Sequence, residues 1–226
     1  MKKIAFCLSG LSRSLWYTWP IMKQYLIIPT NGDVFIHTWD IHHAGSRLDH
    51  HNKAQSTLDI PLEEYINLFI KPKNFIIENY DEFKHKYGNT STPAMYYSIM
   101  KSNELVQMEQ QQYDIVYRIR MDCFFDNIIS TDLLIKENTL YVACNCSPEK
   151  YIHNVTTDIF ALADQTTMNI YANAFTFWLN NRHLQSEQVL HNWLLENHIN
   201  VEWSDMRFKV LDHWTKNRIS AHASYE

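Results

Sequence analysis

The alternation of two kinds of segment constrains the fold of this chain more than any other feature. Short runs rich in β-branched and aromatic residues recur, and longer stretches with apolar residues at helical spacing separate most of them. The strand-like runs are residues 3–8, 33–37, 74–77, 114–117, 140–143 and 158–162, and residues 208–211 form either a last strand or a docked tail. Strands that alternate with helices of about ten to fifteen residues predict an α/β, Rossmann-like mixed sheet with helices on both faces.

The helix-like stretches carry signals for where helices begin. Pro61 suits a first helical position, and Thr92 before Pro93 suits an N-cap. The predicted helices are residues 16–27, a helix from Pro61 with Leu62, Tyr65, Ile66 and Phe69 on one face, a helix from Thr92, an amphipathic helix marked by residues 168–179, and a last one around residues 190–194. His42–Thr57 is polar, histidine-rich and without periodicity, so we expect a mobile loop that either covers a site or only connects two elements.

Composition excludes several classes of protein. With 46% hydrophobic residues, the 226 residues are enough for one large core, and we expect a single domain over residues 1–226. A net charge of −5 argues against general nucleic-acid binding, and no apolar stretch approaches the length of a membrane span. The four cysteines lack zinc-site spacing, so we expect reduced thiols and a cytoplasmic location.

The stretch "YDIVYRIRMDCFFD", residues 113–126, begins as a buried strand and ends in charge. Arg118, Arg120 and Asp122 are spaced by two, so an extended chain places them on one face. Ligands of open α/β sheets bind beyond the carboxyl ends of the strands. Guanidinium groups there hold phosphate or carboxylate, and a carboxylate there binds a divalent cation. The alternative is an internal Arg–Asp pair that satisfies itself at the sheet edge.

Two other strand ends carry polar groups. Ser9, Gly10 and Arg13 form a turn between a strand and a helix, where backbone amides can meet an anion, although the glycine is equally explained by the turn itself. Trp39 and Asp40 end the second strand, where they would stack on a base or sugar and accept ribose hydroxyls. Their alternative roles are a core ring and a turn cap.

Two carboxylates further along are candidates for acid–base chemistry. Asp158 stands just before a strand-like run, and Glu187 stands at the start of a helix, where ordinary dipole pairing also explains it. No H-x-x-x-H pair with an adjacent glutamate and no G-x-S-x-G elbow occurs, which disfavours zinc hydrolases and serine hydrolases.

The motifs resemble a known family when they are taken in order. They are "KIAFCLSGLSRS", "DVFIHTWD", "AMYYSIMKSNEL", "YDIVYRIRMDCFF", "TTDIFALAD" and "SEQVLHNWL", and the resemblance runs from about Lys3 to Trp214, nearly the whole chain. This ordered set is similar to small GT-A-type glycosyltransferases of bacterial polysaccharide loci and large DNA viruses. The resemblance implies a nucleotide-sugar donor, a glycan acceptor and a divalent metal, Mn²⁺ or Mg²⁺.

The resemblance also implies residue roles. The turn from Ser9 to Arg13 would border the nucleotide, and Arg120-Met121-Asp122 would match the D-x-D-type metal motif, with Arg120 where the first aspartate would stand. Asp122 would then hold the metal with the donor diphosphate and a distant ligand such as His213, while Arg120 takes over part of the charge neutralisation.

The two carboxylates would serve the acceptor. Asp158 would act as the general base of an inverting enzyme, or as the acceptor's anchor in a retaining one, and Glu187 would be a second acceptor contact. Two other functions stay open: a non-catalytic nucleotide- or carbohydrate-binding domain on the same fold, and a nucleotide-sugar hydrolase with water as the acceptor.

Overall fold

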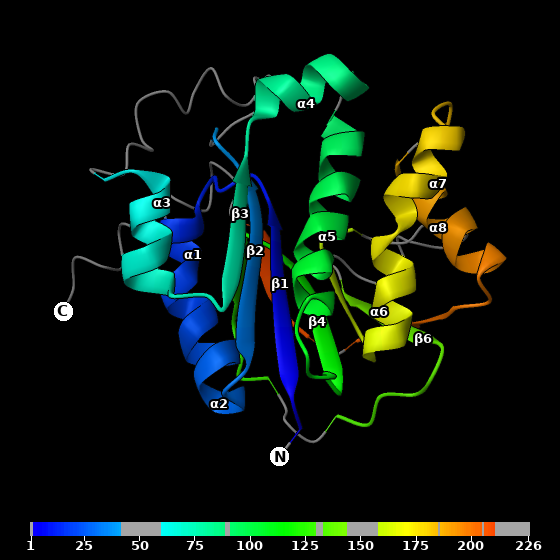
Figure 1. Ribbon diagram of the computed structural model, residues 1–226. Coiled ribbons are helices and arrows are strands. Elements are labelled where there is room, and N and C mark those ends of the chain that lie inside the picture. Colours follow the sequence, from blue (N-terminus) through cyan, green and yellow to red (C-terminus); the bar gives the residue numbers. More distant parts are fainter. Residues whose placement is uncertain are drawn as a thin grey trace.

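A computed structural model describes residues 2–41, 60–88, 91–129, 133–143, 158–184, 186–204 and 206–210. Within these residues, seven strands form one mixed sheet in the order β3-β2-β1-β4-β7-β6-β8 (Figure 1). The strands are β1 (Ile4–Gly10), β2 (Asp33–Trp39), β3 (Asn74–Glu78), β4 (Ile115–Arg120), β6 (Thr139–Ala143), β7 (Phe160–Ala163) and β8 (Asn200–Trp203). The predicted α/β sheet with helices on both faces is therefore confirmed.

The strand directions create a point where the topology reverses. β1 is parallel to both of its neighbours, β2 and β4, and β3 continues the parallel series beyond β2. The chain thus moves outward from β1 to β3 and then crosses back to β4 on the other side of β1. β7 runs antiparallel to β4 and β6, and β8 runs parallel to β6. A crevice for ligands is expected between the carboxyl ends of β1 and β4.

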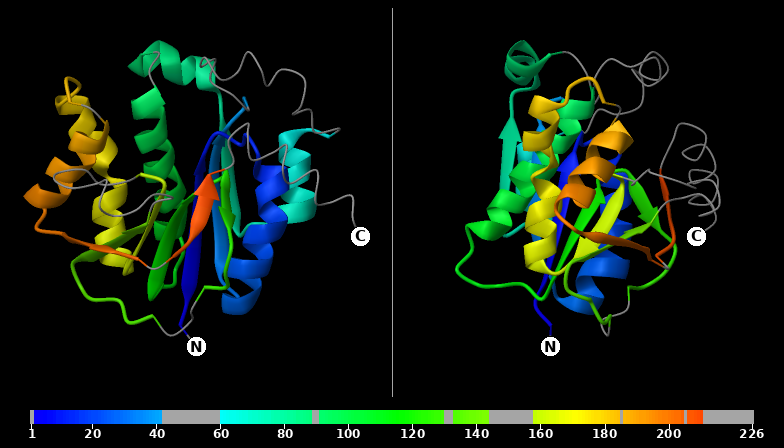
Figure 2. Two further views of the ribbon diagram at one scale, coloured as in Figure 1. Left: turned by 180° about the vertical axis from the view of Figure 1, so that it is seen from behind. Right: turned by 90° about the vertical axis from the view of Figure 1, so that its right-hand side faces the viewer.

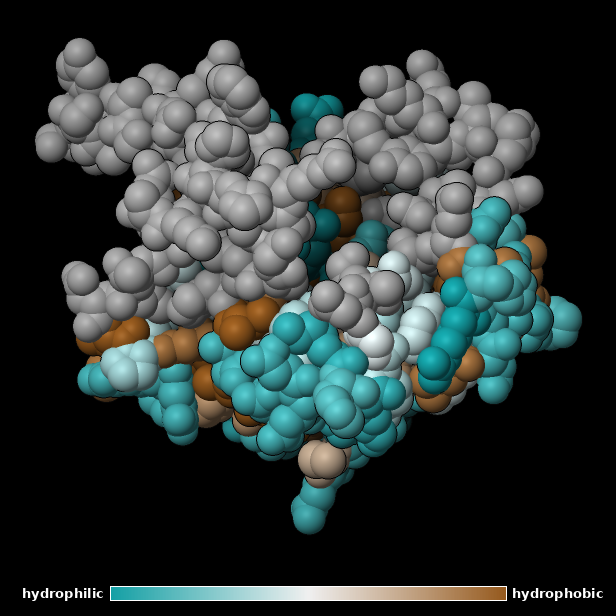
Figure 3. Space-filling model, turned by 90° about the horizontal axis from the view of Figure 1, so that it is seen from above, coloured by the Kyte–Doolittle hydropathy of each residue, from teal (hydrophilic) through white to brown (hydrophobic). Residues whose placement is uncertain are grey.

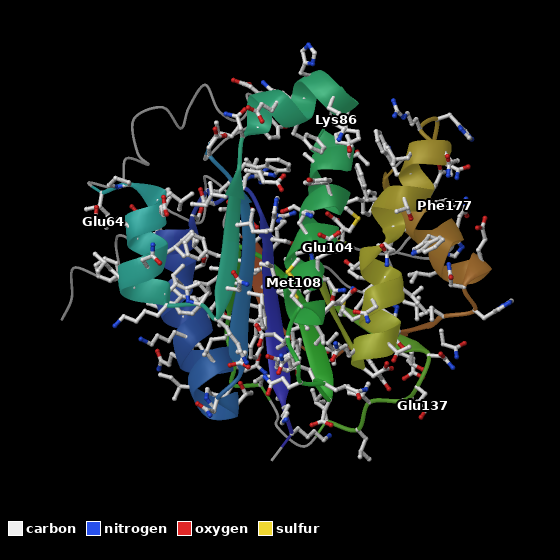
Figure 4. All side chains as sticks on the ribbon, in the orientation of Figure 1. Glu64, Lys86, Glu104, Met108, Glu137 and Phe177 are labelled. Atoms are coloured by element: carbon white, nitrogen blue, oxygen red, sulfur yellow. The ribbon has the colours of Figure 1, made fainter. Side chains whose placement is uncertain are left out.

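Helices cover the two faces as separate layers (Figures 1 and 2). One layer holds α1 (Leu15–Met22), which continues through η1 (Lys23–Ile27) and α2 (Ile28–Thr30), together with α3 (Leu62–Tyr65) and η3 (Ile66–Ile70). The other layer holds α5 (Ser91–Gln107), α6 (Gln165–Ala172), α7 (Ala174–Asn180) and α8 (Ser186–Glu196). α4 (Tyr80–Tyr87) follows β3 at the carboxyl edge, where Figure 4 places Lys86.

Alternation along β4 assigns its side chains to the two layers. Ile115, Tyr117 and Ile119 belong to the hydrophobic cluster on the α1 side, whereas Val116 belongs to the cluster on the α5 side. Because successive side chains of a strand point to opposite faces, Arg118 and Arg120 share the α5 side with Val116. The predicted common face is therefore confirmed for the two arginines, but not for Asp122, because β4 ends at Arg120 and Asp122 lies in the turn that follows.

Several helix predictions need correction. Thr92 is not the N-cap of its helix, because α5 already includes Ser91. Residues 168–179 do not form one helix: the chain breaks at Asn173 between α6 and α7, and the apolar periodicity continues across the break and hides it. Phe69 is 55% exposed, so it does not share the buried face of Tyr65 and Ile66.

Other elements follow no strong sequence signal. β5 (Cys123–Phe125) pairs with β9 (Phe208–Val210) in a separate two-stranded sheet beside α1 (Figure 2). Of the two alternatives predicted for residues 208–211, the last strand is present as β9. β5 is only three residues long and α4 has mostly polar residues, so local pattern predicts neither of them well. His42–Thr57 lies outside the described residues. Among the residues that are described, no helix is long and apolar enough to cross a membrane.

Candidate functional site

Three of the charged residues predicted from the sequence, Arg13, Arg120 and Asp122, meet at the carboxyl edge of the sheet. Ser9 is the register partner of Arg120, so the ends of β1 and β4 lie side by side. Figure 3 looks down on this end of the molecule, and the described atoms near its centre are mostly hydrophilic beside a hydrophobic patch. The edge therefore carries polar side chains at the position where the topology predicts a ligand.

Asp122 is the centre of this group. Its carboxylate is only 2% exposed, and it accepts hydrogen bonds from Arg120 Nε at 2.6 Å and Arg120 Nη2 at 3.1 Å. Arg13 Nη1 lies 3.3 Å from its Oδ2 atom. Both carboxylate oxygens are thus occupied by guanidinium groups that come from two distant parts of the chain. The internal Arg–Asp pair that the sequence left open is present, and a second arginine joins it.

The turn between β1 and α1 delivers Arg13 to this position. Gly10 has φ +113°, a conformation that glycine adopts without strain, whereas Arg13 has φ +26°, which is unusual for a residue with a side chain. Thr18 on α1 donates its hydroxyl proton to the Met121 carbonyl at 2.5 Å, which ties this helix to the turn that holds Asp122. Strained backbone of this kind is often found at ligand clamps.

Electrostatic pairing keeps Arg120 charged. Burial by itself lowers the pKa of Arg120, but the Asp122 carboxylate outweighs burial and raises the pKa above its usual value, with a smaller contribution from Asp158. Asp158 is therefore close to the arginine cluster. It lies there because β7 is antiparallel to β4, so the start of β7 reaches the carboxyl edge.

Arg118 has a different environment from the one predicted. Its side chain is 1% exposed, its Nη1 atom donates to the Ile159 carbonyl, and its Nε atom has no partner within the described residues. The backbone N–H of Arg120 donates to the same carbonyl at 3.0 Å. β4 is flanked by two strands and covered by helices, so a side chain two residues before the strand end is interior. Arg118 would act on a ligand through Ile159 and its neighbour Asp158 rather than by direct contact.

Trp39 and Asp40 have the structural roles that the sequence left open. Trp39 is 1% exposed and its ring packs against Tyr80, Phe83 and Tyr97, so it offers no face for stacking in this conformation. The exposed Asp40 carboxylate accepts hydrogen bonds from the Tyr80 N–H at 2.9 Å and from the Asn79 side-chain amide at 2.8 Å. Donor contact by Asp40 stays a prediction.

Sequence reasoning missed a buried polar chain beneath the β1 turn. Ser98 of α5 accepts a hydrogen bond from the Gly10 N–H at 2.7 Å, and its hydroxyl lies 2.7 Å from His37 Nδ1. His37 Nε2 lies 3.7 Å from Glu78, beyond hydrogen-bond distance but close enough for charge attraction. Burial lowers the pKa of His37. A buried serine at helical spacing gives no signal of its own, because its partner is 88 residues away.

The remaining candidates are only partly described. Glu187 lies in the first turn of α8, as predicted, but its side chain is outside the described part. His213 lies outside the described residues. Within them, no three His, Cys, Asp or Glu side chains gather as a possible metal site.

Comparison with known proteins adds no identification. No family model matches the chain, and no curated protein matches it.

Proposed function

We propose that this protein is a glycosyltransferase that moves a sugar from a nucleotide-sugar donor to a glycan acceptor. The observation that carries the proposal is the Arg13–Asp122–Arg120 cluster at the junction of β1 and β4. Two guanidinium groups at the carboxyl edge of a doubly wound sheet suit a diphosphate, because their planar donors match phosphate oxygens. The ordered motifs of the sequence support the same assignment.

The reaction needs charge stabilisation on one side and proton removal on the other. The bond between the anomeric carbon and the phosphate oxygen breaks, and the nucleoside diphosphate leaves with the electron pair. Arg13 and Arg120 would neutralise the negative charge that develops on the diphosphate. An acceptor hydroxyl forms the new bond to the anomeric carbon, and its proton passes to Asp158 in an inverting reaction. Glu187 would contact the acceptor.

The divalent metal implied by the resemblance fits the described residues poorly. Asp122 is the carboxylate expected to bind it, and both of its oxygens already accept hydrogen bonds from guanidinium groups. We therefore assign no reaction step to a metal. Mn²⁺ or Mg²⁺ bound with help from His213 stays a prediction, as does a cytoplasmic location.

A screen of nucleotide sugars tests the proposal directly. Thermal unfolding with UDP- and GDP-sugars, with and without Mn²⁺, identifies the donor, since a ligand at a hundred times its Kd adds about 2.7 kcal/mol to the stability. Release of UDP or GDP is then measured with and without candidate glycans. Acceptor-stimulated release supports a transferase. Equal release with and without an acceptor indicates a hydrolase instead.

A non-catalytic binding domain is the second candidate. The engagement of both Asp122 oxygens favours it, because a carboxylate neutralised by arginines resembles a structural ion pair. This alternative predicts donor binding in the thermal screen with no nucleotide release under any condition.

A further inference from the structure

Within the part of the chain that the structure describes, the Asp122 carboxylate is contacted by guanidinium groups and belongs to no cluster of metal-ligating side chains. The three contacts of 2.6, 3.1 and 3.3 Å use both of its oxygens, and the side chain is 2% exposed. Divalent cations of the Mg²⁺ class bind through carboxylate and carbonyl oxygens. A cation at Asp122 would have to lie next to the positive charges of two guanidinium groups.

The charges in direct contact with Asp122 suit an anion better than a cation. Arg13 and Arg120 place two positive charges against the single negative charge of Asp122, and Asp158 has a weaker influence on Arg120. The Asp122 carboxylate raises the pKa of Arg120, whose guanidinium is in any case protonated at physiological pH. Two neighbouring guanidinium groups repel a metal ion and attract a phosphate group.

The geometry also leaves hydrogen-bond donors that the ion pair with Asp122 does not use. The ion pair with Asp122 uses Nη1 of Arg13, and the Arg13 side chain is 44% exposed. Ser9 at the end of β1 is buried, and its hydroxyl has no partner within the described residues. The buried carboxylate holds the Arg120 guanidinium through two donors and thereby fixes its orientation, which lowers the entropy that a ligand must overcome to bind it.

We propose that this edge binds the diphosphate of its donor through Arg13 and Arg120 and without a divalent cation. The proposal rests on the proposed function and names how its leaving group is neutralised. Asp122 is then a positioning residue for the two arginines rather than a metal ligand. The charge that a metal would supply at the breaking sugar–phosphate bond comes from the guanidinium groups.

Isothermal titration calorimetry of the full chain tests this proposal with UDP, GDP and inorganic pyrophosphate as probes. Each is titrated in excess EDTA and again in Mn²⁺ and in Mg²⁺. We expect the Kd of the best ligand in EDTA to lie within about threefold of its Kd with metal, since the guanidinium groups supply the charge. A change of about threefold corresponds to less than about 1 kcal/mol of binding free energy. Binding that disappears in EDTA and returns with Mn²⁺ overturns the proposal but leaves the proposed function intact. Failure of all three probes under every condition overturns both.

Variants separate the arginine clamp from general electrostatic attraction. Arg13→Gln and Arg120→Gln should each raise the Kd by tenfold or more, about the effect of one charged hydrogen bond. Arg182→Gln is the matched control, because Arg182 stacks on the Trp178 ring after α7 and loses the same charge. Arg13→Gln changes an exposed side chain, so it stays informative if Arg120→Gln fails to fold. Equal affinities in Arg13→Gln and Arg182→Gln would contradict the clamp.

Discussion

Replacing Asp122 by asparagine separates a carboxylate that holds arginines from one that holds a metal. The substitution keeps the size of the side chain and removes its charge. Arg120 loses the partner of two hydrogen bonds, and Arg13 loses the partner of one. If Asp122 served only as a metal ligand, this substitution would not lower the stability of the metal-free protein. If Asp122 is the centre of a buried ion-pair cluster, the substitution lowers the stability even without metal.

The expected cost follows from the burial of the two pairs. Removing one partner of a buried ion pair costs about 3–5 kcal/mol, and an asparagine oxygen that still accepts one hydrogen bond reduces this to roughly 2–4 kcal/mol. The Arg13 pair adds less than about 1 kcal/mol, because the Arg13 side chain is 44% exposed and its charge is screened by water. We therefore expect Asp122→Asn to lower the free energy of unfolding by roughly 3 kcal/mol.

Equilibrium urea denaturation measures this change. With m-values of about 1–3 kcal/mol/M, the unfolding midpoint should fall by at least roughly 1 M. Asp126→Asn is the control, because Asp126 pairs with Lys209 at 3.3 Å and both side chains are well exposed, at 41% and 64%. That pair should contribute less than about 1 kcal/mol. The same midpoint and m-value for both variants would refute the structural role of Asp122.

Three further predictions concern the donor turn, a buried histidine and the acceptor side. Ser98→Ala should raise the donor KM about fivefold with little change in kcat, because the hydrogen bond from the Gly10 N–H is lost. Ser102→Ala is the control and should leave both constants unchanged, since the Ser102 hydroxyl donates to the Ile99 carbonyl of its own helix. Burial lowers the pKa of His37, so the unfolded state binds its proton more readily and the free energy of unfolding should fall as the pH drops below about 6.5. Urea titrations at several pH values should show a flatter dependence for His37→Asn, and identical slopes would contradict this reasoning. Asp158→Asn should abolish transfer yet keep donor binding, and Glu187→Gln should raise the acceptor KM; full transfer in the first with loss in the second would reverse the two roles.

The groups around His37 on every packed element enter the pH prediction. Glu78 comes from β3, and Lys101 and Glu104 come from α5, where Figure 4 labels Glu104. Glu78 and Glu104 act to raise the pKa of His37, and Lys101 acts to lower it, but burial is the largest influence. The neutral imidazole is therefore the form that the folded state favours.

The amino-acid sequence by itself determined the elements whose signals are local. Alternation and helical spacing depend on neighbours in the chain, so the principal strands and the α/β class follow from the pattern alone. The placement of Ser9 and Asp122 at one edge also followed, because the carboxyl ends of parallel strands meet there. The short strand β5 did not follow, since it is stabilised by pairing with β9, which lies 83 residues or more further along the chain.

Tertiary structure alone decided which charges meet and which are buried. Arg13 and Asp122 are 109 positions apart, and no local sequence pattern predicts that the Arg13 guanidinium will contact the Asp122 carboxylate. Asp158 reaches the same edge only because β7 runs antiparallel to β4, a direction that the composition of the strand does not encode. Arg118 and Arg120 look alike in the sequence, yet one is interior and the other lies at the edge, because burial depends on what packs over each position. Strand pairing and helix packing bring together groups from separate parts of the chain, and these contacts set the charge of the site.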